Sequence, residues 1–324
     1  MLRVFVPSAQ GLAAISLDAT LKLPPTAMWI DLLEPTLEEE HAVESMLGID
    51  IPTREEMKDI ETSNRLYEEN GALYMTATVA AKLDTERPVS TAVTFILANG
   101  LLVTNRYIDT KPFQHFSAYA QRHPSACQSA VIVLAGLIEA FAERIADILE
   151  RIGGDLDQVS GSIFARSNGK DPDSRDLRTL IERIGFNGEL NSKARESLVS
   201  LGRLLMFVQQ SPLVAPSQEQ QQRFRSISRD VLSLSDHASF LGTKVSFLLE
   251  ATLGLINVEQ NNIIKIFSVA AVMFMPPTLI ASIYGMNFHI MPELSWAFGY
   301  PFAIALMFAS MGATYMVFKR RGWL

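Results

Sequence analysis

The chain has 324 residues, of which 48% are apolar, and its single cysteine is Cys127. One cysteine excludes a disulfide framework and a cysteine-based zinc site, and the five scattered histidines lack the spacing of a histidine-rich metal site. Residues 1–262 hold 24 of the 28 basic and 34 of the 35 acidic side chains, a net charge of −10. This part therefore lacks the basic face that nucleic acids require. It would attract cations, although many soluble proteins are acidic without binding any.

The first 125 residues are predicted to form a cytosolic α/β domain. Asn99 and Gly100 stand between two apolar segments, which is a strong signal for a two-residue hairpin. The predicted strands are short, rich in β-branched or aromatic residues and bounded by Gly, Pro or Asn; they cover residues 2–7, 27–32, 72–81, 91–98 and 101–106.

Two helix starts are predicted within this domain. Thr36 with Glu39 and Thr53 with Glu56 each fit the Thr-x-x-Glu capping box, in which the two residues bond each other's backbone N–H. Helical segments should therefore lie between the strands.

Residues 126–216 are predicted to form a cytosolic helical hairpin. The first helix has apolar residues at three- and four-residue spacings, and its fully apolar core, 130–138, is too short to cross a membrane. The second helix is expected over 174–210, and the segment SPLVAP at 211–216 ends it.

A very long helix is predicted over residues 217–284. From Glu219 to Tyr284 the pattern spans about 100 Å at 1.5 Å per residue, a length typical of a coiled coil, a membrane helix or both. Its last part, about 264–284, is expected in the membrane and contains an uncharged run of 18 residues at 266–283, and residues 298–318 form a second uncharged run. Each is close to the ~20 residues that cross the hydrocarbon core. A buried hairpin of a soluble protein is the alternative.

The charges that flank the two apolar runs predict their orientation. Lys265 precedes the first run, and the basic tail 319–324 follows the second, whereas the connection 285–297 has no lysine or arginine. Because positive residues stay inside, both termini should be cytoplasmic and the connection should be periplasmic. The chain is therefore expected to be a multi-pass membrane protein that crosses the bilayer twice.

The sequence YGMNF at 284–288, followed by MPEL at 291–294, resembles the signature of the CorA family of divalent-cation transporters. The likeness is densest over 245–324, including the ends of the second run, FGYP and FKRRGWL, and weaker but consistent upstream. It implies a funnel-shaped homopentamer of the bacterial inner membrane, in which an α+β cytosolic domain is joined through very long stalk helices to two transmembrane helices. It also implies transport of Mg²⁺, often with Co²⁺ and Ni²⁺, without ATP, a resident cofactor or an enzymatic reaction. The implied partners are copies of the chain, membrane lipid and hydrated divalent cations, and no nucleic acid.

The resemblance places a selectivity filter at Gly285, Met286 and Asn287, because in the family the asparagine of this motif forms a ring at the outer pore mouth. Mg²⁺ gives up its waters reluctantly, and neither apolar run contains a carboxylate that could strip them. Five amide oxygens would meet the waters instead, with about 1 kcal/mol net for each bond, which leaves the ion free to move on. Asn287 could alternatively serve only as a helix C-cap beside glycine.

Helical phase and the resemblance together predict the pore wall. Steps of three and four residues from Asn261 follow one face of the long helix. The family places pore positions at Asn261, Met275 and Thr278 and a hydrophobic constriction near Ile264 and Phe267. Ordinary helix packing is the alternative for each residue. The predicted pore-lining residues are Asn261, Ile264, Phe267, Ser268, Ala271, Met275, Thr278 and Ser282.

Acidic residues are predicted to act on either side of the pore. Glu293, the only carboxylate of the outer connection, would concentrate cations at the outer mouth, and Glu250 would do so at the inner vestibule. The family uses intersubunit carboxylates to bind regulatory Mg²⁺, which would make cytosolic Mg²⁺ an inhibitor. The regulatory ligands predicted by placement are Asp84, Glu86, Asp230 and Asp236.

The sequence leaves two alternative functions open. One is the related ZntB branch of zinc transporters, which shares the fold; proton coupling is an expectation for that branch, and its members often depart from the GMN sequence that this chain keeps. A membrane-anchored sensor or enzyme would need a catalytic constellation, but the sequence has no glycine-rich phosphate loop and no clear nucleophile–base pair.

Overall fold

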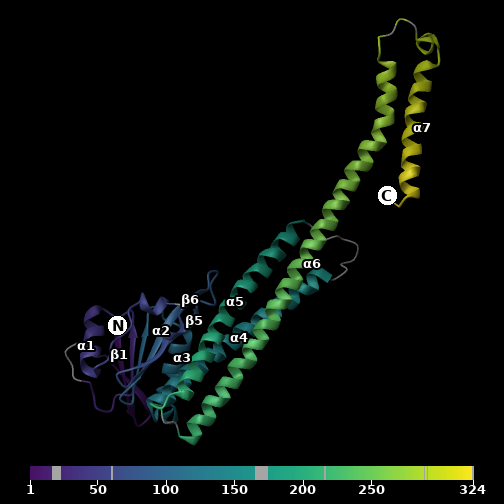
Figure 1. Cartoon of the computed structure of the whole chain (residues 1–324). Coiled ribbons are helices and arrows are strands. Elements are labelled where there is room, and N and C mark those ends of the chain that lie inside the picture. Colours follow the sequence, from purple (N-terminus) through teal and green to yellow (C-terminus); the bar gives the residue numbers. More distant parts are fainter. Residues whose placement is uncertain are drawn as a thin grey trace. The chain divides into compact units, whose positions relative to one another are not determined.

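The computed structural model describes residues 1–16, 23–59, 61–164, 174–214, 217–287, 289 and 291–322. The chain divides into two compact units, Met1–Asp171 with Arg178–Leu249 and Pro172–Leu177 with Glu250–Leu324 (Figure 1). The predicted α/β domain and most of the helical hairpin therefore pack within one unit, together with the first part of the long helix.

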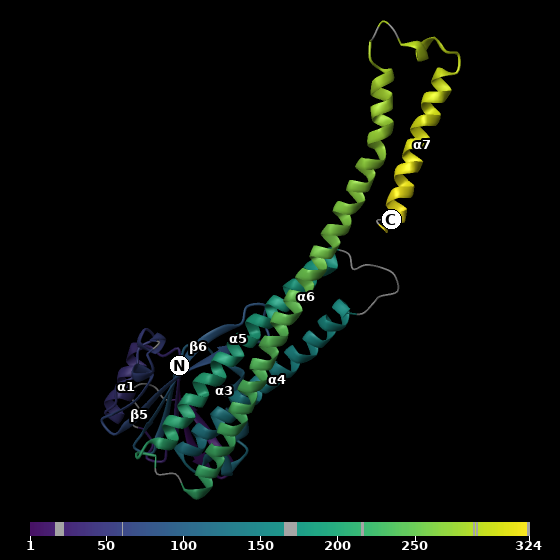
Figure 2. The same cartoon turned by 45° about the vertical axis from the view of Figure 1, so that its right-hand side comes forward.

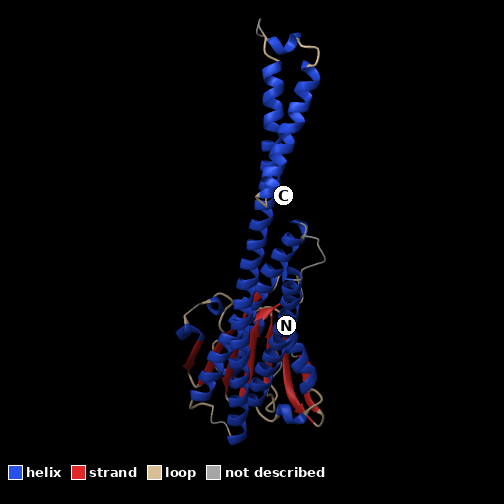
Figure 3. Cartoon of the chain, turned by 90° about the vertical axis from the view of Figure 1, so that its right-hand side faces the viewer, coloured by secondary structure: helices blue, strands red, loops and turns tan. Residues whose placement is uncertain are grey.

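A seven-stranded sheet forms the centre of the first unit (Figure 3). Its order is β2-β1-β3-β7-β6-β5-β4, and all neighbours are antiparallel except β3 and β7. The strands are β1 Leu2–Ser8, β2 Gly11–Ser16, β3 Trp29–Leu33, β4 Leu66–Glu69, β5 Ala72–Ala81, β6 Val89–Ala98 and β7 Leu101–Arg106.

Two tight turns of the same kind connect strands of this sheet. Asn99 and Gly100 both have positive φ, 52° and 79°, and join β6 to β7, which confirms the predicted hairpin. Asn70 and Gly71, with φ of 50° and 76°, likewise join β4 to β5. This second hairpin was not predicted, because β4 is only four residues long and half of it is glutamate.

The helices of the first unit cover both faces of the sheet. They are α1 Leu37–Leu47, α2 Thr62–Arg65, α3 Lys111–Ala120, α4 Ala130–Phe164, α5 Ser174–Gln210 and the first part of α6 Gln218–Tyr284, with 3₁₀ turns at Glu56–Lys58 (η1) and Pro124–Cys127 (η2). On one face Val43 of α1 joins a buried cluster with Val4 and Ile30. On the other face Phe113 of α3 packs on Trp29, with ring centroids 6.2 Å apart.

The two predicted capping boxes have different outcomes. The Thr36 side chain accepts from the N–H of Glu39, whose carboxylate accepts from the N–H of Thr36, so the box opens α1 as expected. Thr53 and Glu56 make the same pair of bonds, but only the short turn η1 follows. A capping box satisfies free N–H groups, but it does not supply the apolar periodicity that a longer helix needs.

A buried ion pair connects β3 to β7. The Arg106 guanidinium donates to both carboxylate oxygens of Asp31, Nε to Oδ1 at 2.9 Å and Nη2 to Oδ2 at 2.8 Å. The Thr104 hydroxyl donates to Asp31 Oδ1 at 2.8 Å. Burial opposes the charge of Arg106, but the hydrogen bonds and attraction from Asp31 outweigh it and raise the pKa of Arg106. Both charges are therefore paired and hydrogen-bonded, which burial requires.

Helix α5 closes the edge of the sheet that β4 leaves open. β4 pairs only with residues 72–75 of β5, so the N–H groups farther along β5 have no strand partner there. The N–H of Thr78 donates to Ser200 Oγ at 2.8 Å, and the N–H of Ala80 donates to Ser197 Oγ at 2.5 Å. Two serines three residues apart on α5 thus satisfy two N–H groups two residues apart on β5.

The second unit contains the end of α6, the 3₁₀ turn Pro292–Ser295 (η3) and α7 Gly299–Arg320. Within this unit α7 runs antiparallel to the end of α6 (Figures 1 and 2). Both helices are long and apolar enough to cross a membrane, and only 6% of each apolar window is buried. A core helix of a soluble protein would be mostly covered, so this observation opposes the soluble-hairpin alternative.

Candidate functional site

The end of α6 has one covered face. Val269 is 4% exposed, and the half-covered residues Lys265, Met273, Ile280 and Tyr284 share its side of the helix at helical spacing. Lys265 Nζ donates to the carbonyl oxygen of Gly322, just after α7, at 3.4 Å. We infer that this covered face of α6 is the one turned to α7.

The predicted pore residues lie on the opposite face. Ala271, for example, is two positions after Val269, and 200° of helical rotation separates the two side chains. All of the predicted residues are exposed: Asn261, Ile264, Phe267, Ser268, Ala271, Met275, Thr278 and Ser282. The structure therefore brings them onto one continuous, uncovered face. That this face lines a pore stays a prediction.

The exposed face is electrically neutral. It combines one amide, hydroxyls, a methyl group and larger apolar side chains, and no Asp or Glu occurs between Glu259 and Glu293. The Thr278 hydroxyl donates to the carbonyl oxygen of Phe274 at 2.7 Å, so its oxygen retains lone pairs that can accept from water. Such a face can accept hydrogen bonds from a hydrated ion but cannot replace its waters with carboxylates.

The GMN sequence lies where α6 ends. The N–H of Gly285 donates to the Ala281 oxygen at 3.0 Å, and the N–H of Met286 donates to the Ile283 oxygen at 3.2 Å. Asn287 follows these last bonds and is exposed. In the described part of the chain four residues other than glycine have positive φ, and Asn287 is not among them. Asn287 therefore does not adopt the left-handed conformation of a helix C-cap.

The structure describes the side chain of only one of the two acids predicted near the pore mouths. Glu250 is exposed on α6. Glu293 falls within η3, but its side chain lies outside the described residues.

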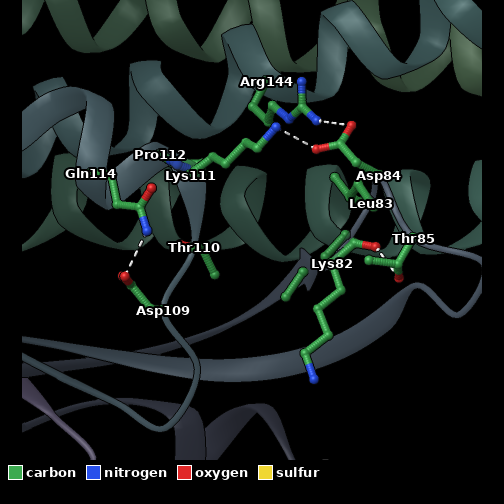
Figure 4. A pocket seen from close by; sticks show the side chains of 12 residues that line it. Lys82, Leu83, Asp84, Thr85, Asp109, Thr110, Lys111, Pro112, Gln114 and Arg144 are labelled. Carbon is green, nitrogen blue, oxygen red and sulfur yellow. Dashed lines mark hydrogen bonds and ion pairs between the residues drawn. The ribbon is translucent and has the colours of Figure 1, made fainter.

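Asp84 lies among cations, as Figure 4 shows. Its carboxylate is 2.6 Å from Lys111 Nζ, 2.5 Å from Arg144 Nη2 and 3.1 Å from Arg151 Nη1. The hydrogen bond from Lys111, reinforced by Arg144 and opposed by partial burial, lowers the pKa of Asp84 to about 2. Three positive groups on one carboxylate repel a divalent cation, so this arrangement opposes the regulatory role that placement suggested for Asp84.

The other three predicted regulatory acids, Glu86, Asp230 and Asp236, are all exposed. Within the described ranges no three Asp, Glu, His or Cys side chains come together as a metal site. Their regulatory role stays a prediction.

The sequence reasoning did not find the cations that hold Asp84. Arg144 and Arg151 are seven residues apart on α4, so they project from the same side of that helix, and this spacing was a usable signal. Lys111 comes from a different element, α3, and no local pattern relates it to the other two.

Comparisons with known proteins agree with this architecture. The family described as CorA-like Mg²⁺ transporter protein matches residues 26–320. The magnesium transport protein CorA of Yersinia pseudotuberculosis is 37% identical over the full length of both chains, and that of Escherichia coli K12 is 39% identical over 92% of each.

Solved structures share the fold. The complete CorA magnesium transporter of Methanocaldococcus jannaschii aligns with a TM-score of 0.77 at 20% identity, over 100% of this chain and 99% of that one. The ZntB cytoplasmic domain of Vibrio parahaemolyticus aligns with a TM-score of 0.57 at 11% identity, over 79% of this chain and 97% of that domain. With relatives matched from end to end and two uncovered apolar helices, the chain is a multi-pass inner-membrane protein with cytoplasmic termini and belongs to the CorA-like family of Mg²⁺ transporters.

Proposed function

We propose that this chain assembles as a homopentamer and conducts Mg²⁺ through an axial pore lined by the exposed face of α6. A ring of Asn287 side chains at the outer end of that face would select the hydrated ion. Co²⁺ and Ni²⁺ would share the path, because they are divalent ions that also carry a water shell. The observation that carries the proposal is the neutral, uncovered face from Asn261 to Ser282, which leads to an exposed Asn287.

The chemistry of this face suits a hydrated ion. Each amide or hydroxyl oxygen accepts a bond from a coordinated water for about 1 kcal/mol net, so no single ring traps the ion. Farther along the face, Ile264 and Phe267 are 62% and 72% exposed in one chain. Rings of these apolar groups would close the pore by excluding water when the helices approach one another.

Self-association is supported by apolar side chains that one chain leaves uncovered. Leu232, Phe240 and Phe247 of α6 are 63%, 62% and 56% exposed, although each belongs to the first unit. Exposed apolar groups at this density mark an interaction surface, and copies of the same helix would cover them.

Regulation is proposed to come from the cytosolic acids. Mg²⁺ held between copies by Glu86, Asp230 or Asp236 would stabilise the closed assembly, and binding to that state alone would make cytosolic Mg²⁺ an inhibitor. Glu250 would raise the cation concentration at the inner end of the pore, and Glu293 would do so outside. Asp84 is left out because its three cationic partners already neutralise it.

The test is Mg²⁺ uptake into proteoliposomes by Asn287→Ala, compared with Asn262→Ala. Asn261 and Asn262 are neighbours, but Asn262 projects toward the covered side of α6, which makes it a matched amide outside the pore. Loss of a ring of bonds should slow uptake about tenfold or more in Asn287→Ala and leave Asn262→Ala unchanged. Uptake that does not depend on Asn287 would contradict the filter.

The zinc alternative is tested by the same assay. The ZntB likeness, at 11% identity, concerns the fold alone. If Mg²⁺ is the cargo, it should compete with Co²⁺ and Ni²⁺, rising Mg²⁺ on the cytosolic side should slow uptake, and a pH gradient should have no effect. A preference for Zn²⁺ together with a requirement for a pH gradient would favour the zinc branch.

A further inference from the structure

A cavity of the first unit lies beside the closed edge of β5. Its volume is about 410 Å³, and it is formed where α5 passes the end of α2 and Thr78 of β5. Three arginines line it: Arg65 from α2, and Arg195 and Arg203 from α5. Arg195 and Arg203 are eight residues apart and therefore lie on one side of α5.

Within the described ranges, no carboxylate lies at ion-pair distance from any of these three guanidinium groups. The ion pairs found between described residues do not include Arg65, Arg195 or Arg203. Glu196 also lines the cavity, but its carboxylate accepts a bond from the Ser90 hydroxyl at 2.7 Å. Three positive charges and one negative charge thus share a cavity in a soluble part whose net charge is −10.

Arg65 is the least satisfied of the three arginines. Its Nε is buried and has no hydrogen-bond partner among the described residues, and its Nη2 makes only a long bond of 3.4 Å to the Met57 oxygen. Burial lowers the pKa of Arg65, the charge of Arg203 lowers it further, and Glu196 opposes both. A buried donor and like charges in close proximity both cost free energy that an anion in the cavity would recover.

Hydroxyl groups complete the lining. Ser200 Oγ accepts from the N–H of Thr78 at 2.8 Å, which leaves its own proton available for donation into the cavity. Ser192, one turn before Arg195 on α5, lines the cavity and is exposed. Each of these arginine and serine side chains can donate a hydrogen bond to an anion in the cavity.

We propose that this cavity binds a phosphate-type oxyanion, either inorganic phosphate or a phosphate group of a nucleotide. The guanidinium fork matches the geometry of phosphate oxygens, and three such forks with two hydroxyls suit a tetrahedral anion of more than one charge. The proposal does not depend on the transport function, and its test measures binding alone.

The experiment is equilibrium dialysis of the full chain in detergent with radiolabelled inorganic phosphate and, separately, with ATP. A chelator removes Mg²⁺, and sodium chloride and glutamate at matched ionic strength are the controls. We expect one saturable site per chain that glutamate and chloride do not occupy. Arg195→Gln and Arg203→Gln should each raise the dissociation constant about tenfold, as loss of a charged hydrogen bond does. Arg178→Gln, an exposed arginine of the same helix, should bind as wild type does.

The affinities for inorganic phosphate and for ATP show whether the bound phosphate group is free or belongs to a nucleotide. Equal affinity identifies the phosphate group as the whole ligand, and tighter binding of ATP identifies a nucleotide. Arg195 and Arg203 are exposed, so replacing them with glutamine should preserve the fold. If the glutamine variants do not fold, the double variant Arg195→Lys with Arg203→Lys keeps both charges and is measured instead. The lysine variant should bind more weakly because the forks are lost. Absence of saturable binding, or binding unchanged in the double glutamine variant, would overturn the proposal.

Discussion

At the scale of single residues, the charges that surround a carboxylate matter more than its place in the sequence. Placement in the cytosolic part makes Asp84, Glu86, Asp230 and Asp236 candidates for the intersubunit Mg²⁺ ligands that the family resemblance implies. Of these four acids, only Asp84 forms ion pairs with three cations among the described residues. All three cations belong to helices that are distant from Asp84 in the sequence. An acid held this way fastens the loop after β5 to α3 and α4.

The first prediction concerns Asp84→Asn. Because the pKa of Asp84 is lowered, from 3.8 to about 2, the ionised form stabilises the fold above the unfolded pKa, and this contribution is lost as pH falls toward 2. Asp84→Asn should therefore unfold at lower temperature than wild type at pH 7, and the difference should shrink between about pH 4 and about pH 2. Circular dichroism of the full chain in detergent measures it.

The control for this prediction is Asp147→Asn. Asp147 is 3.9 Å from Arg144, but it is 71% exposed and has no second cation among its described ion pairs. Its removal should have almost no effect at either pH. A difference for Asp84→Asn that persists unchanged at low pH would show that the carboxylate charge is not the cause.

At the scale of elements, the sequence predicts the long helices well and the short elements poorly. The helix expected over 174–210 is α5 itself, and the expected 217–284 and 298–318 differ from α6 and α7 by at most two residues at either end. Sustained apolar periodicity and the proline-containing stops explain this agreement. β4 has four residues and η1 has three, which is too few for a period to show. Pairing with β5 decides the conformation of β4.

The second prediction concerns the packing of α3 on α4. A Cβ at Gly136 would be 2.2 Å from the ring of Phe116, so Gly136→Ala forces the two helices apart. We expect a loss of about 1–3 kcal/mol in the free energy of unfolding. Gly154→Ala on the same helix meets nothing within 4 Å and should gain about 0.5–1 kcal/mol from helix propensity. Denaturant unfolding of both variants measures the contrast, and equal effects would contradict it.

The third prediction tests which face of α6 meets water. Met275→Cys and Thr278→Cys should react with a charged, water-soluble thiol reagent, and the reaction should slow Mg²⁺ uptake. Met273→Cys and Ile280→Cys, on the covered face, should stay unmodified. Cys127 does not interfere, because it is buried and burial raises the pKa of its thiol, so little reactive thiolate forms. Equal labelling of both faces would exclude a pore on one side.

At the scale of the whole molecule, the tertiary contacts could not be predicted from the sequence. Helical phase from Asn261 placed seven predicted pore residues on one face, the family resemblance added Phe267, and the structure leaves all eight exposed. The cations of Asp84, the serine bonds to β5 and the arginine cavity each join segments far apart in sequence. No periodicity or local motif relates such segments, because folding alone brings them together.

The fourth prediction concerns the assembly. Leu232→Asp combined with Phe240→Asp places charges on the apolar side chains of α6 that copies of the chain should cover. Native mass spectrometry should find pentamers for the wild type and smaller species for this variant, because burying unpaired charges is costly. Met206→Asp, at a 56% exposed side chain of α5, should leave the pentamer intact. Unchanged assembly in the α6 variant would move the interface elsewhere.

The two serines of α5 also bear on unwanted strand pairing between different molecules. An open strand edge recruits strands from neighbouring molecules, and it is a common origin of aggregates. Here Ser197 and Ser200 occupy the N–H groups that such a strand would need, and the helix that carries them stands in its way. This edge of the sheet is thereby closed to pairing with a strand from another copy of the chain.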